Sequence, residues 1–222
     1  MIMALLFVAN ALRADEYLHN VGEFNKISVL DSISVVYRCV PDSSGSVAFN
    51  TDRRFADDLL FSVDKGELKI RVDTEAVGRP DLPVIYVYSR FLEQATNSTN
   101  ATLKIENPAP VPRFKATLVG NGAIEISGLK TTGVEAKITT GNGTIALQGE
   151  CDWAKFTLLG TGTIQADCLK ADTVECKCMG SGTIGCWPEY TLKVNCLGST
   201  KIYYKGEPAV NKKGGGKLIP IE

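Results

Sequence analysis

The sequence is poor in the residues on which most catalytic sites depend. It contains one histidine, His19, so a catalytic triad or a Cys-His pair would depend on that side chain alone. His19 also lies outside the repeats described below, and we expect no mechanism of this kind. Only nine prolines accompany 21 glycines, which indicates many tight turns and not an extended linker.

The chain also lacks an excess of charge and a long apolar run. Its formal net charge is −1 and its pI is about 6.0, so the total charge offers no basic field for nucleic acid and disfavours an anionic membrane surface. No segment approaches the roughly 20 apolar residues that a transmembrane helix requires. We expect no nucleic-acid partner and no transmembrane span.

The N-terminus has the features of an export signal. Residues 1–14 contain an apolar run, and Ala9-Asn10-Ala11 has the form of a signal-peptidase site, although a cut after Ala14 fits as well. No Lys or Arg precedes the apolar run, which leaves an apolar strand or a late start codon as alternatives. The first cysteine is Cys39, so no lipobox follows. We expect a signal peptide over 1–14 and export to the periplasm, the outer-membrane surface or the extracellular space.

The second half of the chain is repetitive. Five segments share an apolar strand, a glycine-containing turn and a second apolar strand: 116–129, 136–149, 156–169, 176–187 and 194–206. The first four begin twenty residues apart, and the fifth follows after eighteen. Regular spacing of this length is typical of a solenoid.

Each repeat has the pattern of strands and not of helices. Apolar residues alternate, as in Ala116/Leu118 and Ile124/Ile126, which is the period of a strand with one buried face. The Gly-x-Gly between them permits a sharp turn without a Cβ penalty. Stacked rungs would bring equivalent residues about 4.8 Å apart. The sequence therefore predicts an all-β fold, a single-stranded parallel β-helix with rungs of ~20 residues.

Charged residues form two further columns at the same spacing. Lys115, Glu135, Lys155 and Glu175 alternate in sign, and so do Lys130, Glu150 and Lys170. Such a ladder could be a charged binding strip, but a solvated face that fixes the register is the simpler interpretation.

Residues upstream have strand composition without a clean repeat. Asp64-Lys65-Gly66 predicts a hairpin, and Phe91 to Ile105 predicts a degenerate rung that turns at Asn97-Ser98. We expect an N-terminal β-portion over 15–90 and a β-helix over 91–222, closed by a cap formed from the residues after Lys212.

These motifs together resemble a known family. The five [LVM]-G-x-G-x-I turns, the early Phe24-Asn25-Lys26-Ile27 strand and the closing Tyr203-Tyr204-Lys205-Gly206-Glu207-Pro208 are similar to the auto-transporter adhesin "head GIN" domain of bacterial envelope proteins. The resemblance extends from about Val21 to the C-terminus. It implies a right-handed β-helix with a smaller N-terminal β-portion, export, and a role in adhesion. It supplies no catalytic residues. The sequence departs from the family pattern in its cysteines and in Ser199-Thr200 of the last turn.

The seven cysteines are interpreted mainly as core residues. Cys176, Cys178, Cys186 and Cys196 occupy columns that hold Leu, Ile, Phe or Val in other rungs. Sulfurs of a C-x-C on a strand lie about 7 Å apart, which suits a single metal poorly. We expect no metal site and no cofactor, and Cys178–Cys196 is the disulfide worth testing.

Carboxylates and aromatic residues are the remaining candidates for a site. Glu125, Asp152, Asp167 and Asp172 are acid–base candidates by type, but Glu125 is followed in its column by Ala146, Gln165 and Gly185, so no acidic cluster is expected there. Trp153, Trp187, Tyr203 and Tyr204 could stack on sugars or complete the core.

The sequence thus favours a non-enzymatic, exported envelope protein that binds a cell-surface glycan or protein through a face of the β-helix. No catalytic, binding or metal residue is singled out. Two alternatives stay open: a polysaccharide-degrading β-helix enzyme, and a structural module that self-associates through an uncapped end.

Overall fold

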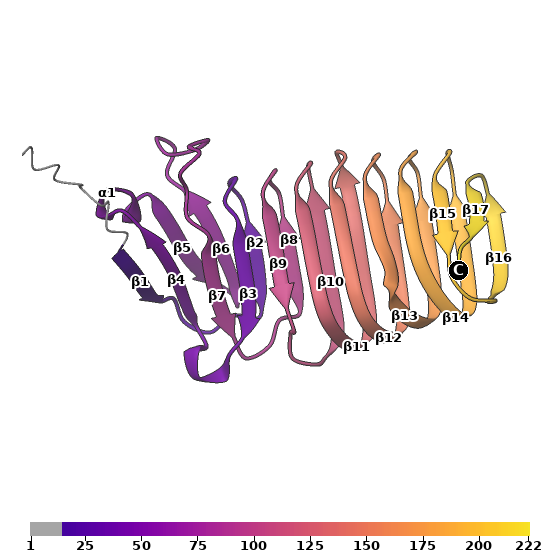
Figure 1. Ribbon diagram of the computed structural model, residues 1–222, viewed down its shortest axis with the longest axis horizontal. Helices are drawn as coiled ribbons and strands as arrows, with labels where there is room; N and C mark the ends of the chain where they lie inside the picture. The colour runs from indigo at the N-terminus through magenta and orange to yellow at the C-terminus, as the bar shows by residue number, and fades with distance from the viewer. Residues whose placement is uncertain (1–14) are drawn as a thin grey trace, which may run out of the picture.

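The protein is a parallel β-helix with a smaller N-terminal portion that also contains antiparallel strands (Figure 1). The computed structural model describes residues 15–222, and the expected signal peptide over 1–14 lies outside the described residues. The strands are β1 (Asp15–Asn20), β2 (Lys26–Val29), β3 (Val35–Cys39), β4 (Ser46–Thr51), β5 (Leu59–Asp64), β6 (Glu67–Val72), β7 (Ile85–Ser89), β8 (Gln94–Asn97), β9 (Thr102–Glu106), β10 (Val111–Val119), β11 (Ala123–Thr140), β12 (Thr144–Leu158), β13 (Thr163–Cys178), β14 (Thr183–Cys196), β15 (Lys201–Tyr204), β16 (Ala209–Gly214) and β17 (Lys217–Pro220). Two short helical turns, η1 (Pro41–Ser43) and α1 (Arg53–Ala56), interrupt the N-terminal part.

The rungs form two facing sheets that meet at two edges. The first sheet contains β10, the second halves of β11–β14, and β16, all parallel. The second sheet contains β9, the first halves of β11–β14, β15 and β17, also parallel. The glycine-containing turns lie in a row along one edge, here called the turn edge, and the long strands bend around the opposite edge (Figure 1). The predicted β-helix fold is confirmed.

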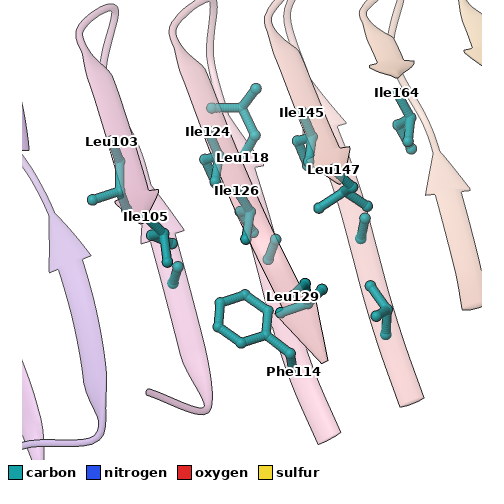
Figure 2. Close-up of a cluster of buried hydrophobic side chains, with 14 of the residues drawn as sticks. Leu103, Ile105, Phe114, Leu118, Ile124, Ile126, Leu129, Ile145, Leu147 and Ile164 are labelled. Atoms are coloured by element: carbon teal, nitrogen blue, oxygen red, sulfur yellow. The ribbon is translucent and has the colours of Figure 1, made fainter. Parts of the chain in front are cut away.

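The apolar columns recognised in the sequence form the core of the β-helix. Ile124, Ile145, Ile164, Ile184 and Ile202 stack in register on the second sheet, and each is fully buried. Leu118, Ile138, Leu158, Cys178 and Cys196 form the facing column on the first sheet. Figure 2 shows side chains of both sheets pointing into the space between them. Because each apolar row is covered only by its neighbours above and below, the rungs stabilise one another.

Large and small core residues compensate within a rung. Phe114 is followed two residues later by Ala116, whereas Ala154 is followed by Phe156, and all four side chains are buried. Phe114 and Ala154 belong to one column and Ala116 and Phe156 to the next. Each of these two rungs thus places one phenyl ring beside one methyl group, so that the bulk changes column from one rung to the other.

The predicted degenerate rung is formed by β8 and β9, and its turn depends on Asn97. The Asn97 side chain is fully buried. Its amide nitrogen donates to the carbonyls of Ala101, 2.8 Å away, and Ala123, 2.9 Å away. Its amide oxygen accepts from the backbone N–H and the hydroxyl of Thr99, at 3.1 and 2.8 Å. One side chain thus satisfies the polar groups of a turn that lacks Gly-x-Gly.

The N-terminal β-portion contains the expected hairpin. β5 and β6 are antiparallel and joined at Lys65 and Gly66, whose φ angles of 51° and 75° are those of a tight hairpin turn. β1 pairs with β4, and β4 with β7, also in antiparallel fashion.

One part of this portion is not where chain order would place it. β2 pairs with both β6 and β8, and β3 with both β7 and β9, in parallel. Residues 26–39 therefore form a rung between two rungs that follow it in sequence. Ile27 and Val29 on β2 and Val35 and Tyr37 on β3 alternate inward as in the regular rungs, so the core continues through them. The division of the chain at residue 90 stays a prediction.

Both ends of the core are covered. At the N-terminal end, the rings of Tyr17, His19, Phe49 and Phe61 pack together, with centroid separations from 5.2 to 6.3 Å. At the C-terminal end, β16 and β17 form a last rung, and the Lys212 ammonium donates to the Gly216 carbonyl at 2.8 Å.

Candidate functional site

The outer face of the second sheet carries a column of polar and small side chains. Because Ile124 and Ile126 point into the core, Glu125 between them points outward. Lys104, Glu125, Ala146, Gln165, Gly185 and Tyr203 lie in register with one another along this column.

The first four residues of this column, from Lys104 to Gln165, line an open groove of about 490 Å³. The groove is lined by Lys104, Glu125, Ile126, Ser127, Ala146, Leu147, Gln148, Gln165, Asp167 and Cys168. Two features create the groove. The small side chain of Ala146 leaves space between Glu125 and Gln165, and the pairing register of β12 and β13 shifts along one wall. A shift falls between Ala146 and Gln148. Irregularities of this kind redirect side chains, and they are common beside functional sites.

A charged network closes the N-terminal end of the groove. The Glu106 carboxylate accepts from Lys104 Nζ and from Arg38 Nε, each at 2.8 Å. These two hydrogen bonds lower the pKa of Glu106, and the same contact raises the pKa of Lys104, to which the nearby Glu125 charge adds. The lysine is therefore held as a fixed cation at the edge of a groove that also contains two carboxylates, Glu125 and Asp167.

A second hollow of about 390 Å³ lies where the strands bend, at the edge opposite the turns. It is lined by Lys130, Thr131, Thr132, Glu150, Cys151, Asp152, Lys170, Asp172 and Glu189. Asp152 and Asp172 are both exposed. They lie next to each other on adjacent rungs, because the residues on either side of them are register partners: Cys151 with Ala171 and Trp153 with Thr173. Burial, with a smaller contribution from the two carboxylates, raises the pKa of the Cys151 thiol to about 12.

The structure thus divides the four predicted carboxylates between two sites. Glu125 and Asp167 lie in the groove and Asp152 and Asp172 in the second hollow. The juxtaposition of Asp152 and Asp172 was missed, although their spacing of twenty residues equals the repeat length and could have revealed it. Gln148 was also missed, because its position depends on the shift in register.

Four of the cysteines are core residues, as predicted. Cys176, Cys178, Cys186 and Cys196 are buried free thiols. Cys178 and Cys196 lie opposite each other on β13 and β14, and the structure holds them as thiols and not as a disulfide. A hydrogen bond with Cys186, together with burial, raises the pKa of Cys176 well above its usual value, and burial with a hydrogen bond to Cys196 raises that of Cys178.

The remaining cysteines occupy other environments. Cys151 is buried at the second hollow, Cys168 is exposed in the groove and Cys39 is half-buried. Among residues 15–222 no three His, Cys, Asp or Glu side chains are grouped so that they could hold a metal ion.

The aromatic candidates serve different parts of the fold. Trp153 packs on the backbone of Gly133, with the Arg113 guanidinium 5.3 Å from its ring. Trp187 is covered by Lys205, whose ammonium lies 5.5 Å from the ring centroid. Tyr204 packs against the core, whereas Tyr203 points outward, in register with Gly185 of the groove column. Tyr203 is therefore the aromatic residue best placed to extend the groove.

The charge ladders are present as predicted, and in the first of them two ion pairs are shifted along the strands. Lys115, Glu135, Lys155 and Glu175 stack in register. Glu135 contacts Arg113 at 3.9 Å and Glu175 contacts Lys177 at 3.2 Å, so these two carboxylates reach cations in the next position along the strands. In the other ladder, Lys130 contacts Glu150 at 3.8 Å. Such exposed pairs contribute little energy, and register is their simplest role.

No helix within residues 15–222 is long and apolar enough to cross a membrane.

Solved structures of similar shape include three from Bacteroides and Parabacteroides species. A "putative adhesin" from Bacteroides fragilis is 23% identical, with a TM-score of 0.83 over 94% of this chain and 97% of that one. A "putative lipid binding protein" from Parabacteroides distasonis is 22% identical, with a TM-score of 0.75 over 95% and 97%. A "putative adhesin" from Parabacteroides merdae is also 22% identical, with a TM-score of 0.70 over 94% and 95%. At these identities the likeness establishes the fold alone.

Sequence comparison identifies the family. No curated protein matches the chain significantly. The family described as "Putative auto-transporter adhesin, head GIN domain" matches residues 23–208, which is most of the chain and includes the turns of all five repeats. The resemblance seen in the repeats is confirmed, and the chain belongs to this head GIN domain family.

Proposed function

We propose that the protein is an exported, non-enzymatic adhesin that binds a glycan in the groove on the second sheet. The observation that supports this most directly is the lining of the groove. Carboxylates, amides and one fixed ammonium group project from successive rungs into an open channel. These groups can donate to and accept from sugar hydroxyls, and Tyr203 offers a ring face in the same column.

The arrangement of the groove carboxylates favours binding over hydrolysis. Glu125 and Asp167 are on rungs two apart, which separates their strands by about 10 Å along the axis, and Asp167 lies two residues further along its strand. Glycosidases hold their two carboxyl groups face to face across one bond, about 5–10 Å apart. A shallow groove with spread polar groups suits several weak contacts along a chain of sugars.

A glycan array on the described chain, residues 15–222, tests this proposal. The expected result is binding to a defined glycan class that falls at least about tenfold in Glu125→Ala and Gln165→Ala, since each loses a polar contact to the ligand. Lys193→Ala, on the outer face of the first sheet, is the matched control. Binding that is unchanged in both groove variants, or absent from the whole array, would overturn the proposal.

The second hollow is the place where a polysaccharide-degrading activity, the alternative function, would have its active site. Asp152 and Asp172 lie on adjacent strands, about 4.8 Å apart, a separation compatible with a retaining glycosidase pair. Release of reducing sugar from a panel of polysaccharides, abolished in Asp152→Asn, would establish this function instead. No release from any member of the panel would support the adhesin.

Export is part of the proposal and is tested separately. Cell fractionation of the full chain should place it outside the cytoplasm, and mass spectrometry should place its N-terminus after Ala11 or Ala14. A cytoplasmic protein that keeps Met1 would contradict export.

A further inference from the structure

Three large apolar side chains are exposed side by side on the turn edge. Leu159, Met179 and Leu197 precede the turns of three successive rungs and are 37%, 65% and 65% exposed. Each backbone N–H donates to the preceding rung, at 3.0, 2.9 and 2.7 Å. Their backbones are therefore fixed in a row. Exposed apolar residues are ordinary when they are scattered, but a contiguous row indicates a surface that is covered in use.

Within its turn segments the same edge carries only positive charge; just outside them, Glu175 contacts Lys177 at 3.2 Å. The edge segments, defined as 117–123, 137–144, 157–163, 177–183, 195–201 and 213–217, contain five lysines and no Asp or Glu. The lysines are Lys137, Lys177, Lys201, Lys213 and Lys217. Lys137 is half-buried and the other four are exposed. They lie on both sides of the apolar row: Lys137, Lys177 and Lys213 on the first sheet, Lys201 and Lys217 on the second.

Acidic residues gather instead at the opposite edge. Glu150, Asp152, Asp172 and Glu189 all line the second hollow, where the strands bend. The net charge of −1 thus conceals a separation of charge across the width of the β-helix. The total charge of the chain disfavoured binding to an anionic membrane surface. The distribution of charge in the structure removes that objection, because the turn edge is positive.

We propose that the turn edge docks on an anionic lipid surface. Surfaces that lie on a membrane combine apolar side chains, which enter the boundary between headgroups and acyl chains, with lysines that pair with anionic headgroups. Leu159, Met179 and Leu197 supply the apolar side chains, and the flanking lysines supply the groups that pair with anionic headgroups. The turns form a nearly straight row (Figure 1), so their tips can reach a flat surface together.

The charge on the edge argues against a second copy of the chain. Two turn edges packed against each other would bring five lysines against five, and like charges in contact repel. The groove lies on a sheet face and not on this edge, so docking leaves it accessible for the proposed glycan.

Flotation with lipid vesicles tests the proposal. The chain should float with vesicles of phosphatidylcholine and phosphatidylglycerol and not with phosphatidylcholine alone, and binding should fall as salt rises. Replacing Lys177, Lys201 and Lys213 by Gln should weaken binding about 100-fold, since each lysine near an anionic surface contributes about fivefold. The double variant Met179→Ser and Leu197→Ser should lose at least about tenfold.

Matched variants at other places complete the experiment. Lys130→Gln with Lys170→Gln, at the opposite edge, and Leu18→Ser, at the N-terminal end, should bind vesicles as the parent does. Glu125→Ala should also keep vesicle binding, which separates failure of this proposal from failure of the glycan groove. No flotation at low salt, equal loss in the opposite-edge variants, or binding of the edge only to an acidic protein would overturn the proposal.

Discussion

Gly133 lies directly against the indole ring of Trp153, its register partner on the next rung. A Cβ atom at position 133 would come within 2.1 Å of a ring carbon of Trp153. Arg113 precedes Gly133 in the same column, and its guanidinium lies 5.3 Å from the ring centroid. The glycine is therefore a gap in the column, and it lets the indole lie flat where the strands bend.

Substituting Gly133 by Ala should destabilise the fold by about 1–3 kcal/mol, because the added methyl group displaces the indole or the backbone. Urea denaturation would measure the loss of unfolding free energy. In the background of Trp153→Ala, the same substitution should cost markedly less, because the clash is absent. Gly185→Ala is the control, since a Cβ there would meet only the Asp167 side chain, at 3.3 Å. An equal loss of unfolding free energy in both backgrounds would contradict the conclusion that Gly133 leaves room for the indole ring.

The turn of the degenerate rung gives a second prediction. Asn97→Ala should cost about 2–4 kcal/mol of unfolding free energy, because it removes the buried side-chain hydrogen bonds to the carbonyls of Ala101 and Ala123 and to the N–H of Thr99. Asn121→Ala, which removes one exposed hydrogen bond to the Asn142 N–H, should cost less than about 1 kcal/mol. Denaturation midpoints of the two variants that coincide would argue against a buried role for Asn97.

The buried thiols predict a loss of stability at alkaline pH. The folded chain raises the pKa of Cys151 to about 12 and those of Cys176 and Cys178 above their usual values. An unfolded thiol ionises near pH 8.5, so above that pH the unfolded chain releases protons that the folded chain retains. The stabilisation is complete below about pH 8.5, and it is lost as the pH rises toward the folded pKa values.

Unfolding free energies measured from pH 7 to 11 would show the slope of stability against pH. Cys178→Val should reduce it by up to about 1.4 kcal/mol per pH unit, the contribution of one thiol. Ile138→Val alters a buried side chain that has no titratable group, and it should leave the slope unchanged. A slope that Cys178→Val does not alter would assign the effect to other groups.

The regular part of the fold could be predicted because its signals are local. Ile124 and Ile126 show the strand period within one rung, and Ile145, one rung later, shows the repeat. Since stacking needs only the next rung, the register follows from the spacing. The groove could not be predicted as a hollow, because it depends on the register shift beside Gln148 and on Ala146 lying between larger neighbours.

The position of β2 and β3 shows where such inference ends. Ile27 and Val35 have the same alternation as the regular rungs, but their partners Ala95 and Leu103 come more than sixty residues later. Nothing in a single rung specifies which other rung it will stack on when it is not its neighbour in sequence. The separation of charge between the two edges was hidden for a similar reason, because it appears only once the turns are aligned.

The last rung gives the final prediction. In register with Val194, where other rungs bury an apolar side chain, β16 carries Lys212, and its ammonium folds back to the Gly216 carbonyl. Lys213, Lys217 and Pro220 lie on the same two edge strands. Lysines and proline at exposed strand edges oppose pairing with another chain. The parent protein should therefore be a monomer, which would argue against the self-associating module.

Replacing Lys212 by Val should restore the apolar column at an open end and promote association through β16 and β17. Size-exclusion chromatography with light scattering should show a concentration-dependent increase in mass for this variant. Lys205→Val, on the loop after β15, is the control and should stay monomeric, because it changes the same charge away from the edge strands. A parent protein that already forms dimers through its C-terminal end would show that Lys212 does not protect the edge.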